Sequence, residues 1–127
     1  MSVTERVSVT AFVDEAATVT FGLCHGQPGE WKLESIDLVP SAALAEDGSN
    51  KYVIAVTQGS DTVATSYDTS TSGNVLAAAV KQSLTMTTTA GAAAEFGSTD
   101  VLKFVATKTG TATLTANVIA TFSQVRV

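Results

Sequence analysis

Apolar and polar residues alternate most regularly in the last third of the chain, residues 100–126. Every second residue between Thr113 and Ser123 is apolar, and Ile119 is the one apolar residue in the opposite phase. A shorter alternating run occupies residues 102–107. Because successive side chains of a strand point to opposite faces, each run predicts a strand with one buried face. The row predicted to face the core comprises Leu102, Phe104, Leu114, Ala116, Val118, Ala120 and Phe122.

The short segment 107–111, which contains Gly110, joins these two runs. A glycine in a short link between two alternating runs predicts a β-hairpin. The outward row of this hairpin is rich in threonine and valine and includes Ile119. We therefore expect a neighbouring subunit to pack on the outward row, and a lysine at position 119 to weaken assembly more than folding.

Further strands are predicted at residues 2–12, 18–24, 30–39, 51–57, 62–68 and 83–88. The first of them is either a strand of the fold or an arm that pairs with a neighbour. The run at 30–39 changes phase between Glu34 and Ser35, which predicts a β-bulge. The runs on either side of Gly59 are predicted to form a hairpin. Its inward residues are expected to be Tyr52, Ile54, Val56, Val63, Thr65 and Tyr67.

Loops are predicted between these runs, where glycine, proline, serine and aspartate gather. Residues 40–50 form one such loop, in which Ser41 is placed to cap a single helical turn over residues 42–46. Residues 75–81 fit one helical turn and irregular chain equally well, because the segment is too short to stand alone as a helix. The loop at 89–99 has Phe96 as its expected anchor.

Seven or eight short strands separated by polar turns predict an all-β fold, a β-sandwich or jelly roll. A length of 127 residues fits one domain, residues 1–127, with residues 1–6 as an extended N-terminal arm. Threonine is the commonest residue and only 15% of residues are charged, which also favours strands.

The charge pattern argues against nucleic acid as a partner. The net charge is −5, and the seven basic residues are scattered singly along the chain. No cluster is available to neutralise several phosphates together. No apolar stretch approaches the ~20 residues of a membrane span, and the first residues lack the pattern of a secretory signal. We therefore expect no membrane partner, and synthesis in the cytoplasm.

Cys24 and His25 are the one candidate pair for metal or nucleophilic chemistry. Structural zinc needs about four ligands, and this chain has a single cysteine and a single histidine. Adjacent strand residues also point to opposite faces, which keeps a histidine base away from the cysteine sulfur. We expect a buried thiol beside an exposed histidine, and no disulfide.

The acidic residues suggest no catalytic or metal site either. Nothing in the pattern places two carboxylates across a cleft, as a glycosidase needs, and residues 46–50 lack the spacing of a calcium loop. Segment 107–111 lacks the glycine pattern of a phosphate loop. The carboxylates considered are Glu30, Glu34, Asp37, Glu46, Asp47 and Asp68. We therefore predict no catalytic, cofactor or metal residues, and no small-molecule substrate.

Three aromatic residues allow two interpretations. Trp31, Tyr52 and Tyr67 are of the type that stacks on sugars, but both tyrosines also fit the inward phase of one hairpin. The core interpretation is favoured, and the sugar platform is kept as the alternative.

The closing segment resembles a known class of protein. A glycine-containing loop (Ala90-Gly91 to Phe96-Gly97) is followed by a run at 100–107, a link at 108–112 and a run at 114–122. This order resembles the C-terminal hairpin of small jelly-roll virion proteins of tailed bacteriophages, above all the head decoration, or cement, proteins. The likeness covers about residues 84–122, and its motif is structural, shared with other β-sandwich domains.

This resemblance implies a homotrimer seated on the outside of an icosahedral capsid, where it clamps neighbouring subunits of the major capsid protein. It implies no enzyme activity and carries over no binding residue. The alternative is a carbohydrate- or receptor-binding β-sandwich module of a phage fibre or tail. A hydrolase ranks last, because no catalytic triad can be placed.

Overall fold

The computed structural model describes residues 5–87 and 95–126, and that part of the chain is built from strands, turns and irregular segments. The strands are β1 (Arg6–Glu15), β2 (Val19–Leu23), β3 (Glu30–Pro40), β4 (Lys51–Gln58), β5 (Asp61–Asp68), β6 (Gln82–Ser83), β7 (Glu95–Phe96), β8 (Leu102–Thr109) and β9 (Leu114–Arg126).

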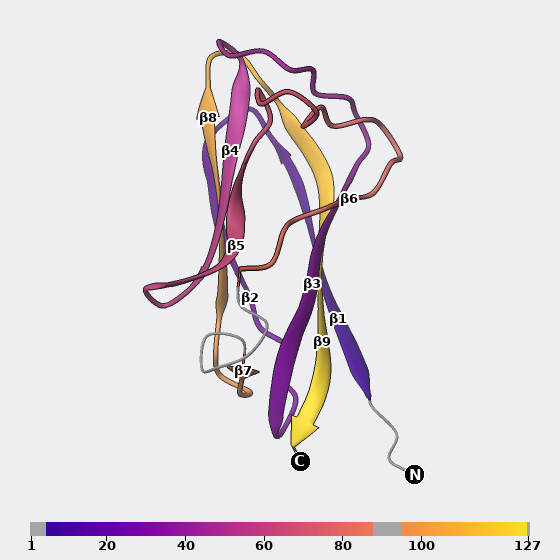
Figure 1. Cartoon of the computed structure of the whole chain (residues 1–127), viewed down its shortest axis with the longest axis vertical. Coiled ribbons are helices and arrows are strands. Elements are labelled where there is room, and N and C mark those ends of the chain that lie inside the picture. The colour runs from indigo at the N-terminus through magenta and orange to yellow at the C-terminus, as the bar shows by residue number, and fades with distance from the viewer. Residues whose placement is uncertain (1–4, 88–94, 127) are drawn as a thin grey trace.

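Two antiparallel sheets pack face to face in an elongated sandwich (Figure 1). Sheet A has the order β1-β9-β3-β6, with β7 also paired to β3, and sheet B has the order β2-β8-β4-β5. The pairs are nested along the chain, because β1 pairs with β9, β2 with β8, β3 with β6 and β4 with β5. This nesting is the strand order of a jelly roll, so the predicted all-β sandwich is confirmed.

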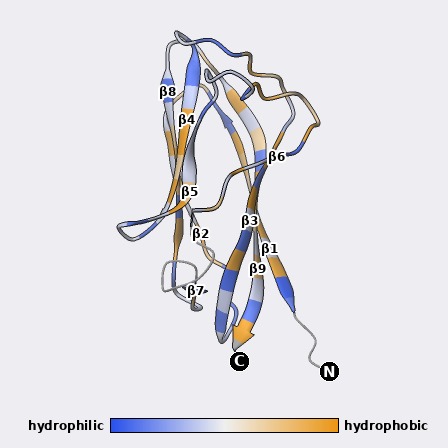
Figure 2. Ribbon diagram, in the orientation of Figure 1, coloured by the Kyte–Doolittle hydropathy of each residue, from blue (hydrophilic) through white to orange (hydrophobic). Residues whose placement is uncertain are grey.

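The core lies between the sheets and is made by the inward row of each strand. All seven residues predicted to face the core from the closing segment are at most 1% exposed. Phe104 of β8 stacks on Phe21 of β2 with ring centroids 4.8 Å apart. Bands of hydrophobic and hydrophilic residues alternate along β3, β9 and β1 (Figure 2). The alternation seen in the sequence therefore does separate a core face from a solvent face.

The predicted closing hairpin is wrong. β8 lies in sheet B and β9 lies in sheet A, so the two strands face each other across the core and do not pair. Each finds its neighbours elsewhere: β8 lies between β2 and β4, and β9 lies between β1 and β3. Both strands still bury the predicted row, because a sandwich buries the inward row of each of its two sheets.

The link between β8 and β9 is a corner at which the chain changes sheet. Gly110 has a φ of 72°, the left-handed region that favours glycine. The loop before β4 packs on this corner: the Asn50 side-chain oxygen accepts hydrogen bonds from the Thr111 backbone N–H and hydroxyl, each at 2.8 Å. Asp47 in turn accepts a hydrogen bond from the Asn50 amide at 3.0 Å. The corner is therefore held by a loop that the sequence predicts as polar surface.

Two details of the strand predictions have different outcomes. The predicted bulge between Glu34 and Ser35 is confirmed, since the register of β3 against β9 shifts between Leu33 and Ser35. In β5 the expected inward position of Thr65 is wrong. The β4–β5 register also shifts, so Ala64 is buried and Thr65 is exposed.

The helical turns considered at 42–46 and 75–81 are absent from these described residues. Leu44 forms an isolated bridge with Leu76, and their backbones exchange hydrogen bonds of 2.9 and 3.0 Å. The expected anchor Phe96 is fully buried, as part of β7 against β3. Most of the predicted arm (residues 1–4), residue 88 of the strand predicted at 83–88, and residues 89–94 of the 89–99 loop lie outside the described residues. The arm's last residue, Arg6, is the first residue of β1.

Candidate interaction surface

The Cys24–His25 pair has the opposite arrangement to the one predicted. Cys24 is exposed and its Sγ donates to the Ser98 carbonyl at 3.1 Å. His25 is 6% exposed, with Nε2 2.9 Å from the Phe96 carbonyl oxygen and Nδ1 accepting from the Gln27 N–H at 3.0 Å. Both imidazole nitrogens are therefore engaged with backbone, and the ring supports the chain rather than the sulfur.

The histidine ring also belongs to an aromatic cluster. Its centroid lies 5.1 Å from that of Phe122, edge to face, and 5.6 Å from that of Trp31. Phe96 packs edge to face on Phe122 at 5.3 Å. These contacts fix β7 and the segment after β2 against sheet A, which is a structural role.

The carboxylates considered for catalysis are spread over the molecule. Asp37 accepts a hydrogen bond from the Ser83 hydroxyl at 2.6 Å, and Glu34 accepts one from the Ser123 hydroxyl. Glu46 accepts one from the Gly73 N–H at 2.8 Å. Among residues 5–87 and 95–126 no group of three metal-ligating side chains comes together, and no pocket is found. None of these residues forms a helix of the length and apolarity that a membrane span requires.

Asp68, at the end of β5, accepts hydrogen bonds from three donors. The Ser70 hydroxyl donates to it at 2.6 Å, the Lys51 ammonium at 2.9 Å and the Ser70 N–H at 2.9 Å. These three donors, the serine hydroxyl first, lower the pKa of Asp68 from 3.8 to about 2. The cluster ties the start of β4 to the turn after β5.

Acidification is expected to weaken the fold through Asp68. Its folded pKa is lower than its unfolded pKa, so its contribution to stability is present above 3.8 and is lost as the pH falls towards about 2. In the variant Asp68→Asn the free energy of unfolding should change less across this range than in the wild type. Denaturant unfolding at a series of pH values measures the free energy of unfolding of the variant and of the wild type.

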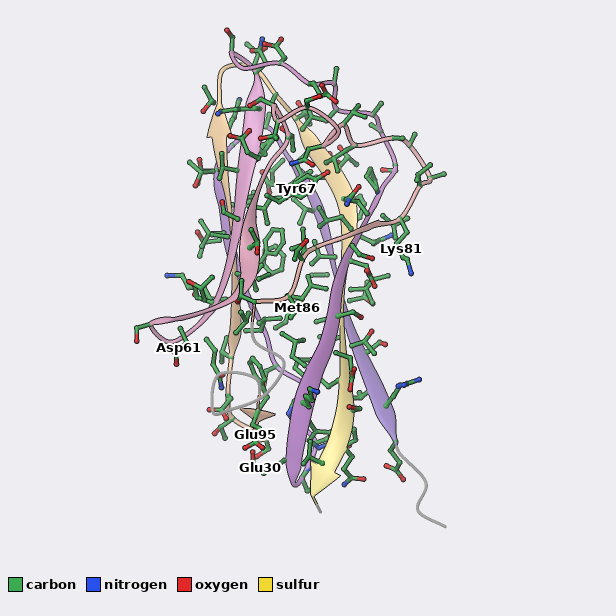
Figure 3. All side chains as sticks on the ribbon, in the orientation of Figure 1. Glu30, Asp61, Tyr67, Lys81, Met86 and Glu95 are labelled. Carbon is green, nitrogen blue, oxygen red and sulfur yellow. The ribbon has the colours of Figure 1, made fainter. Side chains whose placement is uncertain are left out.

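The control for this experiment is Asp61→Asn, which removes a carboxylate at the tip of the β4–β5 turn without touching the cluster (Figure 3). It should follow the wild-type pH profile. Equal pH profiles for Asp68→Asn and the wild type would mean that this carboxylate does not stabilise the fold.

The three aromatic residues of the sugar-stacking alternative all lie in the core. Trp31 is 4% exposed and its indole N–H donates to the Pro28 carbonyl at 2.9 Å. Tyr52 is fully buried, with its hydroxyl 3.0 and 2.9 Å from the carbonyls of Glu15 and Ala17. Tyr67 points between the sheets, whereas Lys81 projects away from them (Figure 3). The core interpretation of these aromatics is therefore confirmed.

Sheet A carries an apolar strip on its outer face. Phe12 of β1 is 62% exposed, and Ile119 of β9 and Val39 of β3 are half-buried. The register places Asn117 between Phe12 and Val39, with Ile119 in the next row of the same face. We call Phe12, Val39 and Ile119 the outer strip. Ile119 faces outward as predicted, although its neighbours on β1 and β3 cover part of it.

One side of the sandwich is closed and the other is open. On the closed side, the backbone of residues 82–87 crosses from one sheet to the other: its first residues hydrogen-bond to sheet A and its later residues to sheet B. Leu84 N donates to Ile36 O at 2.9 Å, and Thr65 N of β5 donates to Thr85 O at 2.7 Å. On the opposite side β1 and β2 are the last strands of their sheets, and within the described chain neither pairs with a further strand.

The sequence was compared with models of protein families and with curated proteins, and neither comparison finds a match. Function must therefore be argued from the residues and the fold. The features that remain are surfaces: the outer strip of sheet A and the open side formed by β1 and β2.

Proposed function

We propose that this protein is a structural virion protein, not an enzyme, that binds the outside of an icosahedral phage capsid. On the capsid it would clamp neighbouring subunits of the major capsid protein and so stabilise the shell, as a homotrimer made in the host cytoplasm.

The jelly-roll strand order is the observation that supports the proposal most. The resemblance to decoration proteins rests on residues 84–122, whose last two strands do not form the hairpin that carried it, whereas the nested strand pairs extend from β1 to β9. A rigid sandwich suits a clamp, which needs contact area and stiffness rather than a reacting group. Specific interfaces of ~800 Å² per partner are built from such faces and strand edges. Repetition on a symmetric shell multiplies weak contacts.

The outer strip is the surface that we assign to the capsid. An exposed phenylalanine on the same face as a half-buried valine and a half-buried isoleucine is typical of an interface. The outer face of sheet B carries Lys51, Lys103 and several threonines beside Val53, Ala55 and Val105, and its described residues include no exposed phenylalanine. The fibre or tail module remains the second candidate, and no observation favours it, because its three aromatics are buried.

Purified protein is expected to bind expanded phage shells, to bind free capsid subunits less, and to raise the temperature at which the shells break. Co-sedimentation measures the binding, and calorimetry of decorated and bare shells measures the heat resistance. Protein that neither sediments with shells nor changes their melting would refute the proposal.

The variant Ile119→Lys tests the assigned surface. A lysine at position 119 of the outer strip should reduce shell occupancy while leaving most of the folding stability, because position 119 lies outside the core. The matched control is Thr107→Lys, an exposed position on the outer face of sheet B. Equal shell occupancy of the two variants would move the contact away from the outer strip.

A further inference from the structure

The free edge of β1 presents a defined set of backbone groups. The Gln124 N–H donates to the Glu5 carbonyl at 2.9 Å, and the register places these two residues opposite each other. In an antiparallel pair, alternate residues point their N–H and C=O groups towards the partner strand. Odd-numbered residues of β1 therefore bond to β9, and even-numbered residues point their backbone groups away from it. The residues at the free edge are Arg6, Ser8, Thr10, Phe12 and Asp14.

This edge lacks the usual protection against pairing. Between Val7 and Val13 the strand has no charged residue and no proline, and most of its side chains are β-branched. Soluble proteins usually interrupt such an edge with lysine, proline, a bulge or a covering segment. The opposite side of this sandwich has such a cover, residues 82–87. In the described part of the chain β1 has none.

The core is also incompletely covered on this side. In the described ranges, seven hydrophobic residues pack against the core while remaining partly exposed, and five of them lie on β1 and β2. These five are Val7, Val9, Ala11, Val19 and Phe21. A strand added next to β1 would cover the three that lie on β1, because they share its inward row.

We propose that β1 pairs antiparallel with β1 of a second copy of this chain, so that sheet A continues across a two-fold axis at Thr10. Only registers that place even-numbered residues opposite even-numbered residues join the free backbone groups and keep the core faces aligned. In the register centred on Thr10, Arg6 lies opposite the partner's Asp14, and Asp14 lies opposite the partner's Arg6. The inward row pairs Val7 with the partner's Val13 and Val9 with the partner's Ala11.

Charge identifies the occupant as a second copy. Arg6 and Asp14 are exposed, stand at the two ends of the uncharged stretch and have no ion-pair partner among the described residues. Two-fold pairing gives each of them an opposite charge at once, and another protein's strand would have to supply both. A two-fold contact joins copies in pairs and differs from the contact that would close a trimer, so the two contacts together would give particles of six chains. The inference therefore does not rest on the proposed function.

Disulfide trapping tests the register directly. In a Cys24→Ser background, Thr10→Cys should give a covalent dimer on mild oxidation, because facing residues of a hydrogen-bonded antiparallel pair have Cα atoms about 5.5 Å apart. The matched control is Ser8→Cys, which is equally on the outer face of β1. Its two copies would be separated by about four residues, or ~14 Å, along the strands and should not cross-link.

Charge exchange tests the ion pairs. Arg6→Asp alone places two like-charged pairs in the contact, and so does Asp14→Arg alone, so each should weaken association by about tenfold or more. An equimolar mixture of the two variants should associate as tightly as the wild type, because each copy then meets opposite charges at both ends. The probe in each case is the chain itself, followed by analytical ultracentrifugation at low salt.

The outcomes decide the proposal. Wild-type particles with an even number of 13.0 kDa chains, a dimer trapped at position 10 and recovery in the mixture support it. Particles of one or three chains, no trapping at position 10, trapping at position 8 that equals or exceeds it, or a mixture as weak as its components would overturn it. If the protein is a pure trimer and still binds shells, the proposed function stands and the β1–β1 contact is refuted.

Discussion

Replacing Phe122 with alanine is expected to lower the free energy of unfolding by about 3–5 kcal/mol, the usual cost of removing a buried aromatic side chain. Phe122 is fully buried in β9, the strand between β1 and β3. Its ring also holds the rings of Phe96 and His25 edge to face. The cavity would therefore loosen β7 and the segment after β2 together with the centre of sheet A.

Urea unfolding followed by fluorescence measures this loss, and Trp31 supplies a signal close to the site. The matched control is Val125→Ala, a truncation on the same strand at a residue that is 46% exposed. The control should cost less than about 1 kcal/mol. Similar losses for the two variants would show that the neighbouring rings refill the space.

The corner residue Gly110 is expected to tolerate no side chain. A Cβ at this position would collide with the backbone oxygen of Ser49 and with the side chain of Asn50. A non-glycine residue at positive φ stores strain of order 1–3 kcal/mol, and moving the Ser49 carbonyl adds to it. We expect Gly110→Ala to cost at least about 3 kcal/mol and to break the hydrogen bonds between Asn50 and Thr111.

Gly59 provides the control, because its φ is 60° and nothing lies within 4 Å of the position of a Cβ. Gly59→Ala therefore carries the backbone strain without the collision and should cost about 1–2 kcal/mol. The difference between the two variants, measured by denaturant unfolding, isolates the collision. If the two variants lose the same stability, the loop at residues 47–50 moves aside easily and does not hold the corner.

The sequence predicts the faces of the strands well, because burial of one face leaves a period of two that local reading detects. It predicts the pairing of the last two strands wrongly, because a corner between sheets and a hairpin turn can both be a short link that contains glycine between two alternating runs. Gly110 at positive φ fits either. The choice depends on which strands offer free backbone groups to β8 and β9, and those strands lie far away in the sequence.

The burial of His25 could be predicted from the alternation of the preceding strand. Val19, Phe21 and Leu23 share one phase, and His25 continues it, while Cys24 falls in the outward phase. Residue type predicts a buried cysteine, whereas the phase of the strand predicts a buried histidine, and the structure agrees with the phase. The position of Thr65 had no such signal, because the shift in the β4–β5 register becomes visible only with both strands in place.

The nested strand pairs also determine when this molecule can fold during its synthesis. Among the strands of this fold β1 leaves the ribosome before the others and its partner β9 after them, so no ladder of β1 with β9 can form until the rest of the sandwich has been made. The residues that pair between β1 and β9 are about a hundred positions apart in the sequence. Contacts of such large sequence separation close long loops and slow folding. Throughout that interval the uncharged segment from Val7 to Val13 has both of its edges free. During synthesis β1 is therefore the strand most exposed to unwanted pairing, and the arrival of β9 ends that exposure on one edge.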